Sequence, residues 1–287
     1  MQAIRNLLVI MEPEQPEGLA LKRAKLIAGV TQSHLHLLVC DKKHDHSAYL
    51  SDLCATLNQE GYKASGQQAW HENLHQTVIS VQQAEGCGLV IKQHFPDNPL
   101  KKAILTPDDW KLLRYCPSPV LMVKTDKPWA GGIVLAAVDV GNADGEHRTL
   151  HASIINHGYD IATLAKASLH VISAHPAPML SAGDPTFQLK ETIEARYRDE
   201  CKAFQAEYGI ADDCLHIAEG PADALIPQVA HQLSAAVTVI GTVARSGLSG
   251  ALIGNTAEVV LDSVESDVLV LKPEEIIAHL EELVANH

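Results

Sequence analysis

The sequence predicts an α/β protein made of two Rossmann-like domains in tandem, each with a five-stranded, mostly parallel sheet and helices on both faces. Three observations support this prediction. Short apolar runs alternate with segments of helical spacing along the chain. The order of these segments restarts after Thr125–Gly132, a stretch that contains proline and paired glycine. Matching apolar motifs recur before and after that stretch, as expected for a duplicated unit. Strands that alternate with helices typically form a parallel sheet covered on both faces.

The first half of the pattern contains five apolar runs that end at turn signals. These predicted strands are Leu7–Met11, Leu35–Cys40, Tyr62–Trp70, Leu89–Ile91 and Val120–Lys124. Helical spacing separates them at Gly18–Gly29, Tyr49–Glu60 and Leu74–Gln83. A fourth helix is expected after Thr106, because Thr106 is a favourable N-cap residue and Pro107 suits the first helical position. The two acids that follow suit the helix dipole.

The second half repeats this order. Its predicted strands are Ile133–Val138, Leu169–Ala174, Cys214–Ala218, Val237–Ile240 and Asp267–Leu271. Its predicted helices are His147–Ala165, Thr186–Tyr208, Ala222–Leu233, a segment that begins at Asn255, and the acidic tail Glu274–Ala285. The linker lies within Thr125–Gly132, so we predict domains at residues 1–126 and 132–287.

Four pairs of segments from the two halves can be aligned. LLVIME matches VLAAVD, LHLLVC matches LHVISA, LVIK at 89–92 matches TVIG at 238–241, and PVLMVK matches DVLVLK. In this alignment the positions of Gly241, Ala244 and Gly254 correspond to Lys92, Phe95 and Leu105. Large side chains at such positions would keep a phosphate away from the backbone. The first half is therefore expected to have lost any phosphate site, or else to bind a different ligand.

The stretch Val237–Leu271 is the most informative part of the chain. A β-branched run ends at Gly241, a loop of small residues continues to Gly254, and helical spacing starts at Asn255. A strand, a small-residue loop and a helix start allow backbone N–H groups and a helix N-terminus to converge on an anion such as phosphate. This order predicts a nucleotide-type binding module.

The same stretch, GTVARSGLSGALIGNTAE, resembles the ATP-binding signature of the universal stress protein family. That signature is a glycine, two residues, a glycine, nine residues, and a glycine followed by serine or threonine. Its four positions fall here on Gly241, Ala244, Gly254 and Asn255, so two match and two differ. Together with the repeat, the loop resembles the tandem, two-domain branch of the family, whose domains have the adenine nucleotide alpha hydrolase-like fold.

The resemblance implies that the second half binds an adenine nucleotide, ATP or AMP, with no metal beyond the magnesium carried by the nucleotide. The contacts that it implies are Val138, Asp139, Val171, Ile240, Gly241, Ala244, Gly254, Asn255 and Thr256. Asp139 matches the family's acid near the nucleotide, and Val171 matches a position that contacts adenine. Because family members commonly pair, the resemblance also implies an intramolecular pseudo-dimer of the two halves. Further pairing of two chains and a downstream protein partner stay open.

Several of these residues also have a structural interpretation. Asp139 could be a turn or helix-cap residue, and Val171 could be an ordinary core residue. Ala244 would cost roughly 1 kcal/mol in a left-handed backbone and nothing in a right-handed one. The amide of Asn255 can donate to a phosphate oxygen, but Asn255 followed three residues later by Glu258 also resembles a capping box.

Composition restricts the range of partners. The net charge of −13 argues against nucleic acid or an anionic membrane as the main partner. No apolar run approaches the ~20 residues that cross a bilayer, and the N-terminus lacks a signal-peptide pattern. The six cysteines form no C-x-x-C pair, which favours free, buried thiols in a reducing compartment. We therefore expect a soluble, cytoplasmic protein that is not inserted in a membrane.

Sixteen histidines raise the question of a metal site. The close pairs are His71 with His75, His34 with His36, and His44 with His46. The first pair, four residues apart, is expected on one face of a helix. Zinc requires three or four converging ligands, and none of the pairs has an evident third. We therefore predict no protein-bound metal, and no change in metal content when His71 and His75 are replaced.

The chain has no G-x-S-x-G motif and no Walker A motif, and no base can be named for hydrolysis. This favours a binding protein over an enzyme, with slow ATP hydrolysis left open. Two alternatives to nucleotide binding are a nucleotide-free interaction scaffold, and a binder of another ligand in the cleft between the halves. For that ligand we consider an amphipathic molecule or a sugar nucleotide.

Overall fold

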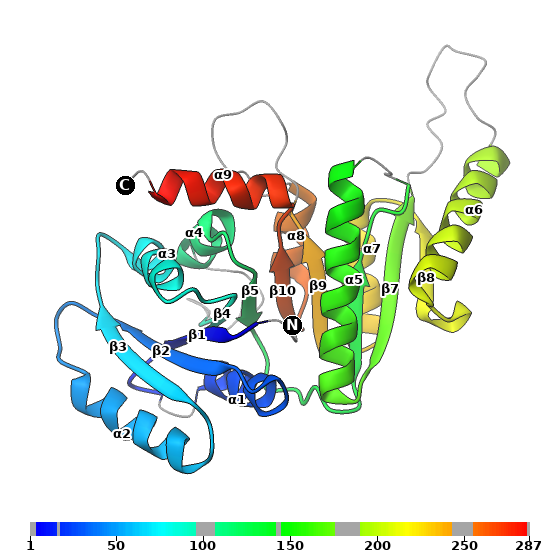
Figure 1. Cartoon of the computed structure of the whole chain (residues 1–287). Coiled ribbons are helices and arrows are strands. Elements are labelled where there is room, and N and C mark those ends of the chain that lie inside the picture. The colour runs from blue at the N-terminus through cyan, green and yellow to red at the C-terminus, as the bar shows by residue number, and fades with distance from the viewer. Residues whose placement is uncertain are drawn as a thin grey trace.

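The computed structural model describes residues 4–15, 18–95, 107–141, 145–175, 190–242 and 255–285. Strands and helices alternate along this part of the chain (Figure 1). The first half contains β1 (Asn6–Met11), α1 (Leu19–Thr31), β2 (His34–Cys40), α2 (Ser47–Gln59), β3 (Ala64–Ala69), α3 (Leu74–Ala84), β4 (Leu89–Gln93), α4 (Pro107–Tyr115) and β5 (Val120–Val123). The second half contains β6 (Ile133–Ala137), α5 (Gly145–Ala165), β7 (Ser168–His175), α6 (Lys190–Tyr208), β8 (Leu215–Glu219), α7 (Ala222–Gln232), β9 (Val237–Gly241), α8 (Asn255–Ser263), β10 (Asp267–Leu271) and α9 (Glu274–Ala285).

The predicted strands and helices are present, with bounds that differ by a few residues. Helix α4 begins at Pro107, the position expected for a proline in the first turn. The predicted cap Thr106 and the predicted start of α6 at Thr186 lie outside the described residues. No helix in the described part of the chain is long and apolar enough to cross a membrane.

All strands of the described chain belong to one ten-stranded sheet, in the order β3-β2-β1-β4-β5-β10-β9-β6-β7-β8. Within each half the five strands are parallel and follow the same order. The halves meet where β5 pairs with β10, and this pairing is antiparallel. The predicted fold class is thus confirmed. In addition, the two five-stranded sheets pair through β5 and β10 and form one continuous sheet.

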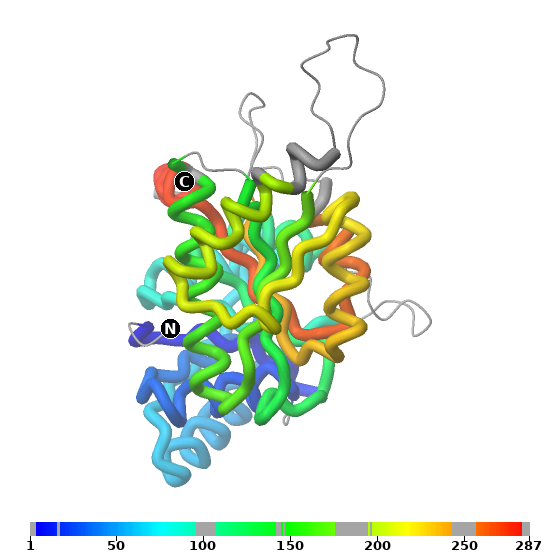
Figure 2. Tube along the Cα trace, turned by 90° about the vertical axis from the view of Figure 1, so that its right-hand side faces the viewer, coloured from blue at the N-terminus to red at the C-terminus, as the bar shows by residue number. Residues whose placement is uncertain are grey.

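Two hydrophobic cores lie on opposite faces of the sheet. Leu7 and Val9 of β1 belong to the core that includes residues of α1, α2, α5 and α6. Leu8 and Ile10 belong to the core under α3, α4, α7 and α8. Alternate residues of a strand point to opposite faces, so a strand buried on both sides reads as a continuous apolar run. Figure 2 shows the helices of the second half on either side of its strands.

The strand register corrects the alignment of the two halves at one strand. Leu7 of β1 is paired with Leu89 of β4, and the equivalent residue Val134 of β6 is paired with Val237 of β9. Gly241 therefore corresponds to Gln93, and the predicted match of Gly241 with Lys92 is wrong by one position. Both runs are apolar throughout and give little information about register, whereas a slip of one residue exchanges the two faces of a strand.

A buried carboxylate lies where the two halves join. Asp267, at the start of β10, is fully buried and accepts hydrogen bonds from Arg23 Nε at 2.7 Å and Trp129 Nε1 at 2.8 Å. Its Oδ1 also accepts from the backbone N–H of Lys124 at 2.9 Å and of Thr125 at 3.1 Å. Burial raises the pKa of Asp267, and the neighbouring guanidinium of Arg23 opposes that rise. One side chain thus connects α1, the end of β5 and the linker to the last strand.

Two lysines at equivalent positions extend the junction. Lys124 Nζ donates to the carbonyl of Leu261, in the last turn of α8, and to that of Val264, just after the helix, each at 2.7 Å. Lys272 Nζ donates to the carbonyl of Cys116, just after α4, at 2.7 Å. Burial lowers the pKa of each lysine to about 8. Each half therefore supplies an ammonium group that satisfies helix-end carbonyls of the other half.

We expect Asp267→Ala to lower the free energy of unfolding by about 3–5 kcal/mol, because the substitution leaves the Arg23 guanidinium buried without its counter-charge. Urea denaturation monitored by circular dichroism measures the change. Glu265→Ala is the matched control, since Glu265 is exposed two residues away and its loss should change stability by less than about 0.5 kcal/mol. Equal stabilities of the two variants would contradict a structural role for the buried carboxylate.

Candidate functional site

The candidate ligand site of the second half lies at the carboxyl edge of its parallel strands. Strands β6, β7 and β9 end at Ala137, His175 and Gly241. In parallel α/β sheets, ligands bind outside this edge, at the loops that leave the strands. Most of the described residues singled out in the sequence are found here, just after β6, at the end of β9 and at the start of α8.

The bend after β6 has its backbone donors already engaged. The N–H of Asp139 donates to His151 Nε2 at 3.2 Å, and the N–H of Val140 donates to Ser173 Oγ at 3.1 Å. The N–H of Gly141 donates to the hydroxyl of Tyr197 at 3.2 Å. These three successive amides are therefore satisfied by protein side chains and are not free to bind an anion.

Tyr197 of α6 is a site residue that the sequence analysis did not identify. Besides accepting from Gly141, its hydroxyl lies 3.0 Å from the carbonyl oxygen of Ala174 and 3.2 Å from Asp139 Oδ1. Burial raises the pKa of Tyr197 to about 12, so the hydroxyl is protonated at neutral pH. Tyr197, Cys201, Phe204 and Tyr208 follow each other at helical spacing, and this stripe could have revealed the buried face of the helix.

Gly241 has a packing role that is independent of any ligand. A Cβ at this position would lie 2.6 Å from Leu150 Cδ2 and 3.0 Å from Ile154 Cδ1, both on α5. The absence of a side chain therefore lets α5 lie directly over the end of β9. The next residue, Thr242, donates its N–H to the carbonyl of Leu271 at 2.9 Å and continues the sheet.

The other predicted contacts differ widely in exposure. Asp139 is exposed, whereas Val138 and Ile240 are buried and Val171 has 0% of its surface exposed, within the core on the α5 side. Ala244 and Gly254 lie outside the described residues. Asn255 and Thr256 open α8, but only their helical backbone is described.

Of the predicted capping box at the start of α8, the structure describes the side chain of Glu258. Glu258 Oε1 accepts from Arg114 Nη2 of α4 at 3.2 Å. The carboxylate thus contacts a helix of the other half, across the junction between β5 and β10. A reciprocal bond from Asn255 stays a prediction.

A groove of about 530 Å³ lies between α5 and α6, beside this edge. It is lined by Val140, Arg148, Thr149, His151, Ala152, Glu200, Ala203, Phe204, Glu207 and Tyr208. His151 and Val140 connect it directly to the bend that contains Asp139. Its volume lies within the range of ligand pockets, roughly 300–1,000 Å³, and its lining combines aromatic surface with charged groups.

The equivalent edge of the first half holds a buried ionic network. Asp109 of α4 has 0% exposure and accepts from Lys92 Nζ at 2.7 Å, and His94 Nδ1 lies 2.8 Å from its other oxygen. Nearby Glu12, which corresponds to Asp139 in the register, has its pKa raised by burial, an effect that the charge of Lys92 opposes. Charged side chains thus fill this edge of the first half.

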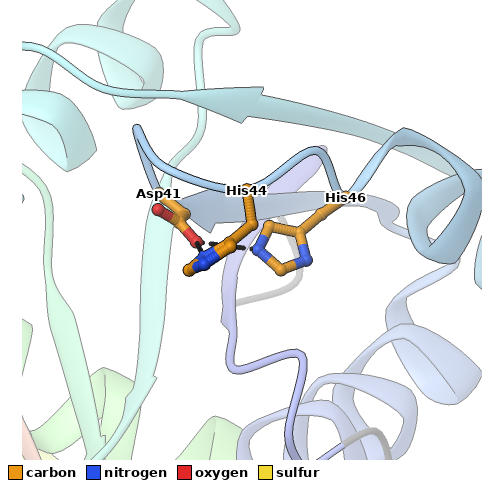
Figure 3. Close-up of side chains that lie close together, drawn as sticks. All are labelled: Asp41, His44 and His46. Carbon is orange, nitrogen blue, oxygen red and sulfur yellow. Dashed lines mark hydrogen bonds and ion pairs between the residues drawn. The ribbon is translucent and has the colours of Figure 1, made fainter.

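The structure also brings together a set of possible metal ligands that the sequence analysis missed. Asp41 Oδ2 lies 2.9 Å from His44 Nδ1 and 2.9 Å from His46 Nε2 (Figure 3). The sequence signal was D-x-x-H-x-H, directly after a predicted strand, in which Asp41 is the third ligand that the histidine pair by itself lacks.

The predicted pairing of His71 and His75 on one helix face is wrong. Helix α3 begins at Leu74 with Asn73 as its cap, so His71 precedes the helix and His75 belongs to its first turn. The predicted match of LHLLVC with LHVISA, which aligns His36 with His170, is confirmed by the register, because these histidines pair with the equivalent residues Leu8 and Leu135. The six cysteines are free thiols, of which Cys87, Cys116 and Cys201 are buried.

The sheet order and the helices on both faces define a Rossmann-like α/β protein of two matched halves. Comparison with known proteins narrows this class. Residues 133–272 match the universal stress protein family. The chain is 30% identical to Universal stress protein E of Escherichia coli K12, over 96% of both chains. It is 31% identical to a Universal stress protein E homolog of Haemophilus influenzae, over 89% of this chain and 84% of the relative. The chain therefore belongs to the universal stress protein family.

Two solved structures have the same fold. A functionally unknown protein from Pseudomonas aeruginosa PAO1 is 72% identical and superposes with a TM-score of 0.93, over 100% of this chain and 99% of that one. A universal stress protein from Archaeoglobus fulgidus is 16% identical, with a TM-score of 0.60 over 94% of this chain and 99% of that one. At 16% identity, the similarity to the Archaeoglobus fulgidus protein shows a shared fold and nothing about function.

We expect Gly241→Ala to reduce the free energy of unfolding by about 1–3 kcal/mol, because the added methyl group must displace Leu150 and Ile154. Gly29→Ala is the control: Gly29 lies in α1 with open space where a methyl group would lie, so alanine should stabilise by about 0.5–1 kcal/mol. Thermal and urea unfolding compare the two variants. If both substitutions stabilise the protein, the packing role of Gly241 is wrong.

Proposed function

We propose that this chain is a universal stress protein whose second domain, residues 132–287, binds an adenine nucleotide, ATP or AMP, as a sensor or coupling module. The observation that carries the proposal is that β9 ends at Gly241 and α8 starts at Asn255, with a glycine-rich sequence between them, while the exposed Asp139 follows the neighbouring strand β6. Adjacent strand ends of a parallel sheet are where nucleotides bind in this architecture. Residues 243–254 and the N-terminus of α8 would supply the phosphate contacts.

The first domain, residues 1–126, is proposed as a degenerate partner in an intramolecular pseudo-dimer. The ionic network of Lys92, His94 and Asp109 supports this role, since it occupies the edge that a nucleotide would need. The antiparallel pairing of β5 with β10 is the kind of contact that two separate subunits would make about a two-fold axis.

Binding without efficient turnover is part of the proposal. Near Asp139, Val140 donates its N–H to Ser173 and Gly141 donates its N–H to Tyr197. The Tyr197 hydroxyl is protonated at neutral pH. Such a hydroxyl is a poor base for activating water. Any ATP hydrolysis would then be slow, and the nucleotide would act through occupancy.

Asp139→Ala is expected to weaken ATP binding by about tenfold or more, because a lost hydrogen bond to a charged group is worth about 1.5–3 kcal/mol. Isothermal titration calorimetry of the full chain with ATP and with AMP, in the presence of magnesium, measures the affinity. Asp52→Ala removes another exposed carboxylate, on α2 in the first half, and should leave binding unchanged. No saturable heat with the wild-type chain would refute nucleotide binding and favour the scaffold role.

A second candidate function is the binding of another small molecule in the groove between α5 and α6. The groove supports this alternative because Phe204 and Tyr208 offer aromatic surface while Arg148 offers a positive charge. An amphipathic molecule or a sugar nucleotide has matching chemistry. This location differs from the expected cleft between the halves, where β5 and β10 are hydrogen-bonded to each other.

Mass spectrometry of molecules released on denaturation distinguishes the two candidates. A co-purified adenine nucleotide supports the first, and a different ligand whose retention is abolished by Ala203→Trp supports the second. Ala203 lines the groove, so a large side chain there should fill it.

A further inference from the structure

The loop between β2 and α2 gathers one carboxylate and two imidazoles around a common point. Asp41 directly follows β2, and His46 directly precedes α2, with His44 between them. In Figure 3 both imidazole rings are turned toward the Asp41 carboxylate. The three ligand atoms Oδ2, Nδ1 and Nε2 all lie within 4.8 Å of one another. We propose that Asp41, His44 and His46 bind one divalent transition-metal ion of the zinc type.

The ligand atoms have the spacing that such an ion needs. Ligands at about 2.0–2.2 Å from a tetrahedral zinc ion are about 3.3–3.6 Å apart. The Asp41 oxygen lies 2.9 Å from each imidazole nitrogen, so a metal requires these atoms to move apart by about half an ångström. The ion takes the place of the protons in these two hydrogen bonds. The side chain of His44 is 73% exposed and can rotate outward to allow this movement.

A side chain of the neighbouring strand holds the loop in this shape. Gln68 of β3 donates from Nε2 to the carbonyls of Asp41, at 2.9 Å, and of His44, at 2.6 Å. Its Oε1 accepts from the N–H of His46 at 2.7 Å. One amide group thus fixes the backbone of all three ligand residues. Supporting hydrogen bonds of this kind orient ligands before the metal arrives.

The carboxylate itself is fixed with one oxygen directed to the imidazoles. Asp41 Oδ1 accepts from the N–H of Lys43 at 2.7 Å, which leaves Oδ2 for the two histidines. An aspartate side chain is ionised at neutral pH. A charged oxygen and two imidazole nitrogens suit zinc and its neighbours, whereas Mg²⁺ and Ca²⁺ prefer oxygen ligands alone.

Three protein ligands leave a coordination position open. The side chains of Asp41 and His46 are 24% and 19% exposed, and His44 is at the surface, so water can complete the shell. Structural zinc sites are usually closed by four protein ligands. This site therefore suits reversible binding. It lies in the first half of the chain and does not depend on the proposed nucleotide site.

Zinc affinity of the untagged full-length chain, freed of metal by a chelator, tests the proposal. Competition with a chromophoric chelator should give one bound zinc per chain, unaffected by excess Mg²⁺. His44→Ala and His46→Ala should each weaken zinc binding by about tenfold or more, and Gln68→Ala by about 10- to 100-fold through misplaced ligands. His44 is exposed, so its variant should keep the wild-type circular dichroism spectrum and urea midpoint.

His71→Ala is the matched control, because His71 is an exposed histidine of the same half outside the cluster. It should retain wild-type zinc affinity, as should Asp139→Ala in the other half. Failure of the wild-type chain to bind zinc overturns the proposal. Wild-type affinity in the doubly substituted His44→Ala, His46→Ala chain overturns it too, because the ion would then be bound elsewhere.

Discussion

The antiparallel pairing of β5 with β10, secured by the buried Asp267, is the constraint on which the rest of the structure depends. A carboxylate without partners would not tolerate complete burial, and here four donors from α1, β5 and the linker surround it. Arg23 in turn donates to the carbonyls of Thr125 and Lys127, and its guanidinium lies 5.0 Å from the centre of the Trp129 ring. The linker is thereby part of the core and closes the contact between the halves.

The direction of this pairing decides where sites can form. Strands β5 and β10 run in opposite directions, and the strands within each half are parallel. The carboxyl ends of the first-half strands and those of the second-half strands therefore point in opposite directions. The first-half edge carries the Lys92 network and the loop of Asp41, and the second-half edge carries Asp139 and the end of β9. Two ligands bound at these edges would not share a cleft. Communication between them would have to pass through the sheet and the buried junction.

The two halves show how one architecture accommodates different chemistry at equivalent positions. In the second half Gly241 allows α5 to approach the strand, whereas its counterpart Gln93 in the first half accepts the N–H of Leu19 at 2.7 Å. Ile240 belongs to a core, whereas its counterpart Lys92 reaches a carboxylate on α4. The two halves share one backbone architecture. The side chains at the carboxyl ends of the strands decide whether this region is occupied by charged groups of the protein or left accessible to a ligand.

The alternation of strands and helices, the duplication and the family likeness could be predicted from the sequence, because each depends on patterns within short segments or on matches between them. Contacts between distant segments could not. Tyr197 lies 58 residues from Asp139 and Arg23 lies 244 residues from Asp267, and no local pattern relates such pairs. The correct alignment of β4 with its equivalent strand β9 could not be predicted either, because an apolar run that is buried on both faces keeps the same pattern after a shift of one residue.

The sequence by itself therefore determined the order of elements and the two-fold repetition of the chain. Only the tertiary structure decided that the halves form one sheet, that side chains occupy the amides after β6, and that Gln68 brings Asp41 together with His44 and His46. The physical reason is that hydrophobic periodicity acts along the chain, whereas hydrogen bonds and buried charges are satisfied across it, by whichever residues the fold brings within reach.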